Sequence, residues 1–182
     1  MTWNPPPTPL LDRVVKVLFR RLKQVSDDPR KLPVVDQTVL AVYGAQGVID
    51  NGGVRFFFES DWPGRPPYAF FVDAYRRIGA RAATKGLERA VARLPGKRPH
   101  LAILQRNRFM DALKEEDAFF DDKICGDVTV WAKLEEYVRE NANALWRRPT
   151  TPDAATTPRR TRSTGRTAAR RTRGPRRRPK PR

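Results

Sequence analysis

Hydrophobic positions near the start of the chain follow the period of an α-helix. Apolar residues between Leu11 and Val25 recur at the i, i+3, i+4, i+7 spacing of one helix face, and basic residues occupy the opposite face. The pattern ends at Asp28-Pro29. A second helix is predicted from about Val34 to Ile49. Its two glycines each weaken the helix by about 1 kcal/mol relative to Ala, or mark a close approach to another helix.

Residues that favour turns follow this second helical pattern. Asn and Gly tolerate positive φ, so the sequence predicts a chain reversal at Asn51-Gly52-Gly53. The next segment, Val54 to Phe58, fits either a short helix or a short strand. Trp62 to Pro67 is predicted to be a loop because it is rich in Pro and Gly.

Three more helices are predicted in the rest of the globular part. They run from about Tyr68 to Ile78, from about Ala82 to Leu94, and from Val128 to Leu145, where Asp127 is a candidate N-cap. The region from His100 to Phe120 has a less regular pattern. No run of alternating strands is convincing. The sequence therefore predicts an all-α fold, a single compact domain of about six helices.

Composition changes near residue 148. The chain has 37 Lys or Arg and 20 Asp or Glu, a formal net charge of +17, yet residues 149–182 alone hold 12 of the bases and one acid, or +11. This segment contains six prolines and no Leu, Ile, Val, Phe, Tyr or Trp. It cannot bury enough apolar surface to offset an ordering entropy of roughly 1–2 kcal/mol per residue. We predict a proline-rich lead-in at residues 1–9, a helical domain at 10–148 and a disordered basic tail at 149–182.

The basic tail is the strongest candidate binding segment in the sequence. Its cations can neutralise phosphates without a fixed geometry, so it is predicted to associate with DNA or RNA without sequence preference. Arg exceeds Lys by 11 to 1, which favours bidentate phosphate contacts. A solubilising extension and a membrane-surface role are the alternatives. The candidate nucleic-acid-binding residues are Arg159, Arg160, Arg162, Arg166, Arg170, Arg171, Arg173, Arg176, Arg177, Arg178, Lys180 and Arg182.

Composition also bears on enzyme chemistry and on membranes. One Cys and one His exclude an internal disulfide, a thiolate metal cage and a paired-His metal site. Cys125 and His100 are read as a buried thiol and a loop imidazole, so no enzyme activity, metal or cofactor is expected. The longest charge-free stretch of the domain, Gln37 to Ile49, has 13 residues, against about 20 for a transmembrane helix. With no secretory signal pattern at the N-terminus, we expect a cytoplasmic protein with no membrane partner.

Two charge clusters and two tryptophans have open interpretations. The acids between Asp111 and Asp127 form a cation site, a binding patch or a solvated surface. Basic residues recur at every fourth position from Arg77 to Arg93 and would form one phosphate-facing ridge if Gly79 does not break the helix. Trp131 is expected in the core, and Trp146 is the tryptophan most expected to be exposed.

Several of these segments together resemble a known family. A helix ends in Asn51-Gly52-Gly53, the pair Phe57-Phe58 follows, and an Ile78-Gly79-Ala80 step precedes the next helix. This order is similar to the helical C-terminal domain family named after a bacterial DNA-mimic protein, over roughly Thr38 to Trp146. The resemblance implies a bacterial, all-helical, non-enzymatic domain in which Asn51, Gly52, Gly53, Phe57 and Phe58 are structural.

The net charge of the chain argues against the DNA-mimic function, although the resemblance implies the fold. A DNA mimic needs a surface of carboxylates spaced like phosphates, whereas residues 1–148 carry +6 and the tail +11. Two hypotheses follow. The first is a non-enzymatic protein that associates with nucleic acid through its tail, with nucleoid association as one option and with a protein partner or a homodimer formed by the helical domain. The alternative is a protein-interaction module related to DNA-mimic regulators, with an incidental tail.

Overall fold

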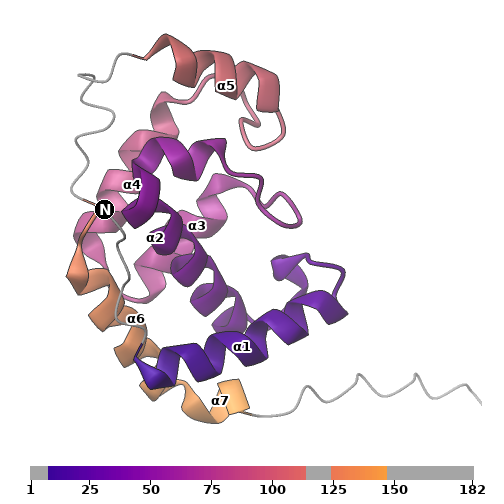
Figure 1. Ribbon diagram of the computed structural model, residues 1–182, viewed down its shortest axis with the longest axis vertical. Coiled ribbons are helices and arrows are strands. Elements are labelled where there is room, and N and C mark those ends of the chain that lie inside the picture. The colour runs from indigo at the N-terminus through magenta and orange to yellow at the C-terminus, as the bar shows by residue number, and fades with distance from the viewer. Residues whose placement is uncertain (1–7, 114–123, 147–182) are drawn as a thin grey trace, which may run out of the picture. The chain divides into compact units, whose positions relative to one another are not determined.

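The protein is all-helical, as Figure 1 shows. The computed structural model describes residues 8–113 and 124–146. Within these residues there are seven α-helices, one short 3-10 helix and no strand: α1 (Pro9–Gln24), η1 (Pro29–Lys31), α2 (Val34–Glu59), α3 (Tyr68–Arg77), α4 (Arg81–Arg93), α5 (Ile103–Ala112), α6 (Val128–Glu140) and α7 (Ala142–Trp146). The predicted all-α class is therefore confirmed. The lead-in and the basic tail fall outside the described residues, apart from Thr8 and Pro9, so the predicted boundaries at 9 and 148 stay predictions.

Helix α2 organises the described residues. It contacts α1, α3, α5 and α6 (Figure 1), and its Val39, Ala45 and Ile49 have no exposed surface. Helix α1 lies against it with the apolar face that the sequence predicts. Its buried residues are Leu11, Val14, Val15, Leu18 and Leu22. Burying each such side chain stabilises the fold by about 1.5–3 kcal/mol, which makes this face the reason why α1 packs here.

The predicted chain reversal at Asn51-Gly52-Gly53 is wrong, because the chain stays in α2 and bends there. Gly53 has φ 71° and ψ −178°, a non-helical conformation inside the element. The Asn51 Nδ2 donates a hydrogen bond to the Gly47 carbonyl at 2.6 Å, one turn earlier. The open choice at Val54 to Phe58 is settled as helix. Phe57 and Phe58 are completely buried, and this core packing decides the conformation that local propensity leaves undetermined.

Two other expectations about helices are corrected, and the open condition at Gly79 is decided. The region predicted as less regular contains α5, whose only buried residues are Arg106 and Met110, so it has a weak apolar pattern. Gly79, at φ 73°, separates α3 from α4, so the basic residues from 77 to 93 do not form one helical ridge. The last helix does not reach Leu145: α6 ends at Glu140, and Leu145 is buried from the separate α7.

The segment around α6 confirms one expectation and contradicts another. The Asp127 Oδ1 accepts a hydrogen bond from the Thr129 N–H at 3.0 Å, which is the predicted N-cap. The sequence predicts a buried Cys125, but Cys125 is exposed. In the turn from Ile124 to Asp127, Ile124 is the residue that is buried. No helix in the described part of the chain is both long enough and apolar enough to cross a bilayer.

Candidate functional site

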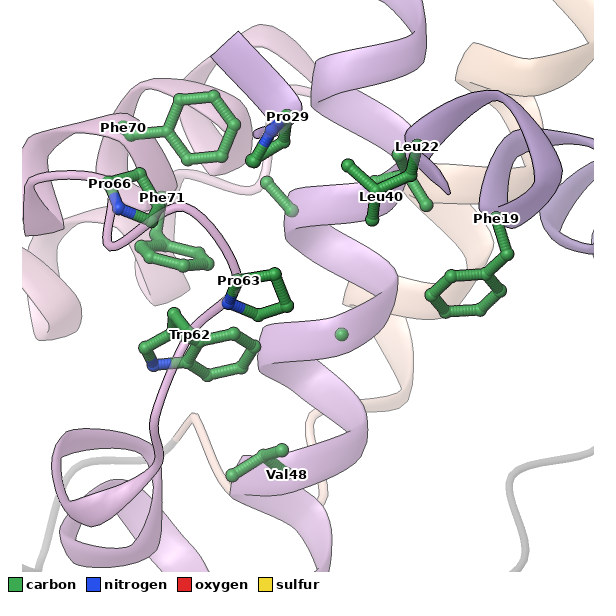
Figure 2. Close-up of a pocket in the computed structure, with 12 residues that line it drawn as sticks. Phe19, Leu22, Pro29, Leu40, Val48, Trp62, Pro63, Pro66, Phe70 and Phe71 are labelled. Atoms are coloured by element: carbon green, nitrogen blue, oxygen red, sulfur yellow. The ribbon is translucent and has the colours of Figure 1, made fainter. Parts of the chain in front are cut away.

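An apolar groove of about 190 Å³ lies beside α2 (Figure 2). Leu40, Gly44 and Val48 recur at one-turn spacing along α2 and form its floor. Phe19, at the C-terminal half of α1, lies on one side of this helix. Trp62, from the loop before α3, lies on the other side, together with prolines and the first turn of α3. Three segments far apart in the sequence thus build one hydrophobic surface.

Trp62 is held rigidly in its side of the groove. Its Nε1–H donates a hydrogen bond to the Phe57 carbonyl at 3.0 Å, and its ring centroid lies 4.7 Å from that of Phe71. A Cβ added at Gly44 would lie 3.4 Å from Trp62 Cζ3, an ordinary van der Waals distance, so the indole packs directly on this turn of α2. The neighbour of Gly44 is thus a loop side chain and not the second helix that the sequence offers as one of two interpretations.

An arginine clamp holds the loop at residues 60–67 against η1. The Arg30 Nε and Nη2 donate to the two carboxylate oxygens of Asp28 at 2.8 and 2.9 Å, and Nη2 also donates to the Gly64 carbonyl at 3.1 Å. Gly64 has φ 69°, and a Cβ there would lie 2.9 Å from the Asp28 Cα. Only glycine fits this position, since both the backbone conformation and the space exclude a side chain. The groove is consequently formed before any ligand binds.

Phe19 is the exposed anchor of the groove. It is 47% exposed, an unusual state for a large apolar side chain on an otherwise basic helix face. At helical spacing its exposed neighbours on the α1 surface are Lys16 and Lys23, three residues before it and four residues after it. The groove therefore combines an apolar floor with a cationic border along α1.

The residues of the family motif lie in the bend of α2 and in the core. A Cβ at Gly52 would come within 2.5 Å of Phe56, and Gly53 has positive φ. Phe57 packs edge-on against Phe58 at a centroid distance of 5.1 Å, and against Phe71 at the same distance. The motif places two aromatic rings in the centre of the fold.

The other candidates from the sequence are spread over the molecule. The twelve basic residues from Arg159 to Arg182 and five of the seven acids between residues 111 and 127 lie outside the described residues. Of the remaining two acids, Asp111 pairs with Arg55 at 3.1 Å and Asp127 caps α6. Trp131 is partly buried and packs on the core, and Trp146 is 45% exposed, both as expected.

Cys125 and His100 offer little for nucleophilic chemistry. The pKa of the Cys125 thiol is raised, chiefly by partial desolvation and also by the carboxylate of Asp50, so less of the reactive thiolate forms at neutral pH. The pKa of His100 is lowered by burial and by the nearby Arg98, Arg30 and Arg106. No group of three or more potential metal ligands occurs in residues 8–113 and 124–146.

Sequence reasoning missed the groove. Its available signal was Phe19, a single aromatic residue among the basic positions of the first helix, together with the aromatic and proline residues of the loop that begins at Trp62. Neither signal indicates that the two segments meet on opposite sides of α2.

The described residues define a small helical domain with a preformed apolar groove on its surface. The chain belongs to the DMP19-like protein family, whose model matches residues 30–141. The match confirms the resemblance to a DNA-mimic protein family. Helix α1, with Phe19, precedes the matched residues, so one side of the groove lies outside the family model. No curated protein and no solved structure shows significant similarity to the chain.

Proposed function

We propose that this protein is a non-enzymatic protein-interaction module whose groove binds an amphipathic helix of a partner protein. The observation that carries the proposal is the preformed apolar groove with the half-exposed Phe19 at its edge. Helix-in-groove binding places apolar anchors, spaced by one turn, into such a surface. Trp and Phe side chains that are already fixed lose little conformational entropy on binding, which favours affinity.

Charge defines the chemistry of the partner. The exposed side chains that border Phe19 on α1 are Lys16 and Lys23. On the opposite side, the charge of Arg65 is balanced by Asp61 at 3.7 Å. We therefore infer that the partner helix carries acidic residues beside its apolar ridge, because complementary charges steer encounter and suppress wrong partners.

Membership in the DMP19-like family supports a role in protein interaction, since a DNA mimic acts by binding another protein. The described residues, however, carry 21 basic and 14 acidic side chains, a net charge of +7. This field attracts an acidic surface rather than the basic surface of a DNA-binding protein. The proposal therefore keeps the interaction role of the family and changes the charge of the partner.

A synthetic peptide tests the proposal directly. The probe is a 16-residue helical peptide with a Leu ridge and Glu flanks, and its isomer has Lys flanks. We expect the Glu peptide to bind the full chain at micromolar concentration, and Phe19→Glu to weaken binding at least about tenfold, as loss of a central anchor does. Leu104→Glu is the matched control, because Leu104 is 76% exposed on α5 and lies outside the groove.

Three outcomes would overturn the proposal. Equal binding of the Glu and Lys peptides would show that charge does not select the ligand. Equal weakening by Phe19→Glu and Leu104→Glu would place the contact elsewhere. Sedimentation that shows a dimer disrupted by Phe19→Glu would identify a second copy as the occupant instead.

A second candidate function rests on the sequence of the tail. The twelve basic residues from 159 to 182, with no aromatic or large aliphatic residue among them, support association with DNA or RNA phosphates. This function is compatible with the groove, because the two involve different parts of the chain.

A further inference from the structure

A second hollow, of about 580 Å³, lies next to the clamped loop and is strongly basic. Arg30 comes from η1, Arg65 from the loop after α2, and Arg98 with His100 from the segment between α4 and α5. Only the tertiary structure brings these three arginines to one place. All three side chains are exposed to solvent, and their positive charges add in one hollow, a field that attracts anions.

Several of these guanidinium groups have unused donors. Within residues 8–113 and 124–146, the Arg98 side chain makes no hydrogen bond or ion pair. Arg30 donates only from its Nε and Nη2, so Nη1 has no acceptor among the same residues. Arg65 pairs with Asp61 only at 3.7 Å, too far for a hydrogen bond. Donors from three elements thus remain for a ligand.

Arg106 lies near the hollow without lining it. It is only 3% exposed; its Nη1 donates to the Pro99 carbonyl at 3.3 Å, its side chain also hydrogen-bonds that of Tyr68, and its Nε has no hydrogen-bond partner among the described residues. Its positive charge adds to the field of the arginines that line the hollow. Arg106 is close enough to His100, which lines the hollow, to lower the pKa of that imidazole.

We propose that this hollow binds the phosphate monoester group of a small molecule, held by Arg98, Arg65 and the Nη1 of Arg30. Arg30 and Arg65 each have a carboxylate partner, Asp28 and Asp61, whereas Arg98 has none among the described residues, so the lining of the hollow keeps positive charge that suits an anion. Guanidinium groups suit phosphate because their paired N–H donors bind two oxygens at once.

The shape of the site favours a compact ligand over a nucleic-acid strand. Its volume falls within the range of small-molecule sites, about 300–1,000 Å³. A nucleic-acid backbone needs cations spread along a track, whereas these side chains converge on one hollow. The site does not depend on the groove or on the tail, so it goes beyond the function proposed above.

His100 gives the site a pH signature. Its neighbours are Arg98 from the same loop, Arg30 from η1, Arg106 from α5, Arg65 across the hollow and the ring of Tyr68 from α3, at a centroid distance of 6.4 Å. Burial and the arginines lower the pKa of the empty site's imidazole. A bound anion offsets the field of the arginines and raises that pKa, so binding takes up a proton and strengthens as the pH falls.

Titration calorimetry on the full chain tests the site with inorganic phosphate and a nucleoside 5′-monophosphate. We expect binding at millimolar concentration or tighter, and at least about tenfold weaker binding in Arg98→Gln, the effect of losing one charge-assisted contact. Arg108→Gln, an equal charge change on the exposed face of α5, should change affinity less than twofold. The basic tail is present in all three proteins, so its contribution is the same in each.

Sulfate, whose charge is constant from pH 6 to 8, isolates the role of His100. Its affinity should rise towards pH 6, by up to about tenfold for each pKa unit that the imidazole shifts on binding, and this trend should vanish in His100→Gln. The proposal is overturned if Arg98→Gln and Arg108→Gln behave alike, if neither phosphate probe binds, or if only a DNA duplex binds. A pH trend that survives in His100→Gln would also contradict it.

Discussion

The indole N–H of Trp131 donates a hydrogen bond to the Oδ2 of Asp50 at 2.9 Å and thereby joins α6 to α2. The other carboxylate oxygen of Asp50 accepts from the Gly126 N–H and from the Gln46 Nε2, both at 2.7 Å. Gln46 continues the network, since its Oε1 accepts from the buried Tyr75 hydroxyl at 2.9 Å. One carboxylate therefore anchors the segment that leads into α6.

Replacing this carboxylate by an amide should loosen α6. In Asp50→Asn an N–H₂ group faces a donor, so at least one buried donor loses its acceptor, and we expect a loss of about 1–3 kcal/mol in the free energy of unfolding. Urea unfolding measures this loss. Trp131→Phe removes only one donor and should cost less. Equal stability of Asp50→Asn and the parent protein would show that the network contributes nothing.

A buried ion pair joins α1 to α2. The Arg21 Nη1 lies 2.8 Å from the Asp36 Oδ2, and the two side chains are 12% and 2% exposed. Removing one partner of a buried pair leaves the other charge uncompensated, so Asp36→Ala should lower the free energy of unfolding by about 3–5 kcal/mol at pH 7. Asp61→Ala, which breaks an exposed pair, should lower it by less than about 1 kcal/mol. Similar losses in both variants would contradict this prediction.

The carboxyl group of Asp36 also makes the free energy of unfolding depend on pH. Burial raises the pKa of Asp36 above 3.8, and the hydrogen bond and charge of Arg21 only partly oppose this shift. The folded protein then holds the proton to higher pH than the unfolded chain does. The proton-linked part of the stabilisation from this group is complete below about pH 3.8 and is lost as the pH rises through the folded pKa. The ion pair with Arg21 remains above that window and accounts for the loss expected in Asp36→Ala at pH 7. The stability difference between the parent and Asp36→Ala should therefore narrow as the pH rises through this window.

Two glycines of α2 should respond in opposite ways to the same substitution. Gly47 is helical with no atom within 4 Å of an added Cβ, so Gly47→Ala should stabilise the protein by about 0.5–1 kcal/mol. Gly53 has equal space but φ 71°, so Gly53→Ala should destabilise it by about 1–2 kcal/mol. Thermal unfolding of the pair separates the two effects. Stabilisation by Gly53→Ala would show that the bend does not require positive φ.

Truncation tests the predicted nucleic-acid binding of the tail. Residues 1–148 should bind duplex DNA at least about tenfold more weakly than the full chain at low salt. The full chain should also lose affinity with a log-log salt slope near −0.9 for each phosphate contacted. A chain with Gln at all twelve basic tail positions is the control for length. Unchanged affinity after truncation, or a flat salt dependence of the full chain, would count against this function.

The predictions from sequence are correct where a feature depends on residues that are close together in the chain, and wrong where it depends on tertiary packing. The buried face of α1 and the Asp127 cap depend on residues within a few turns of each other, and both agree with the sequence. Helix α5 escaped prediction because only two of its residues are buried. At Gly53 the sequence predicts a chain reversal, but the structure has a bend within α2. A glycine with positive φ is compatible with either conformation, and the burial of Phe57 and Phe58 selects the bend.

By itself, the sequence determined the helical class, the family and the concentration of positive charge in residues 149–182, since periodicity, motif order and composition are all local properties of the chain. Only the tertiary structure decided that Phe19, Gly44 and Trp62 build one groove and that Arg30, Arg65 and Arg98 surround one hollow. Within each set, these residues are separated by 18 to 68 positions. Their meeting depends on how α2 packs against its neighbours, and no local pattern encodes that.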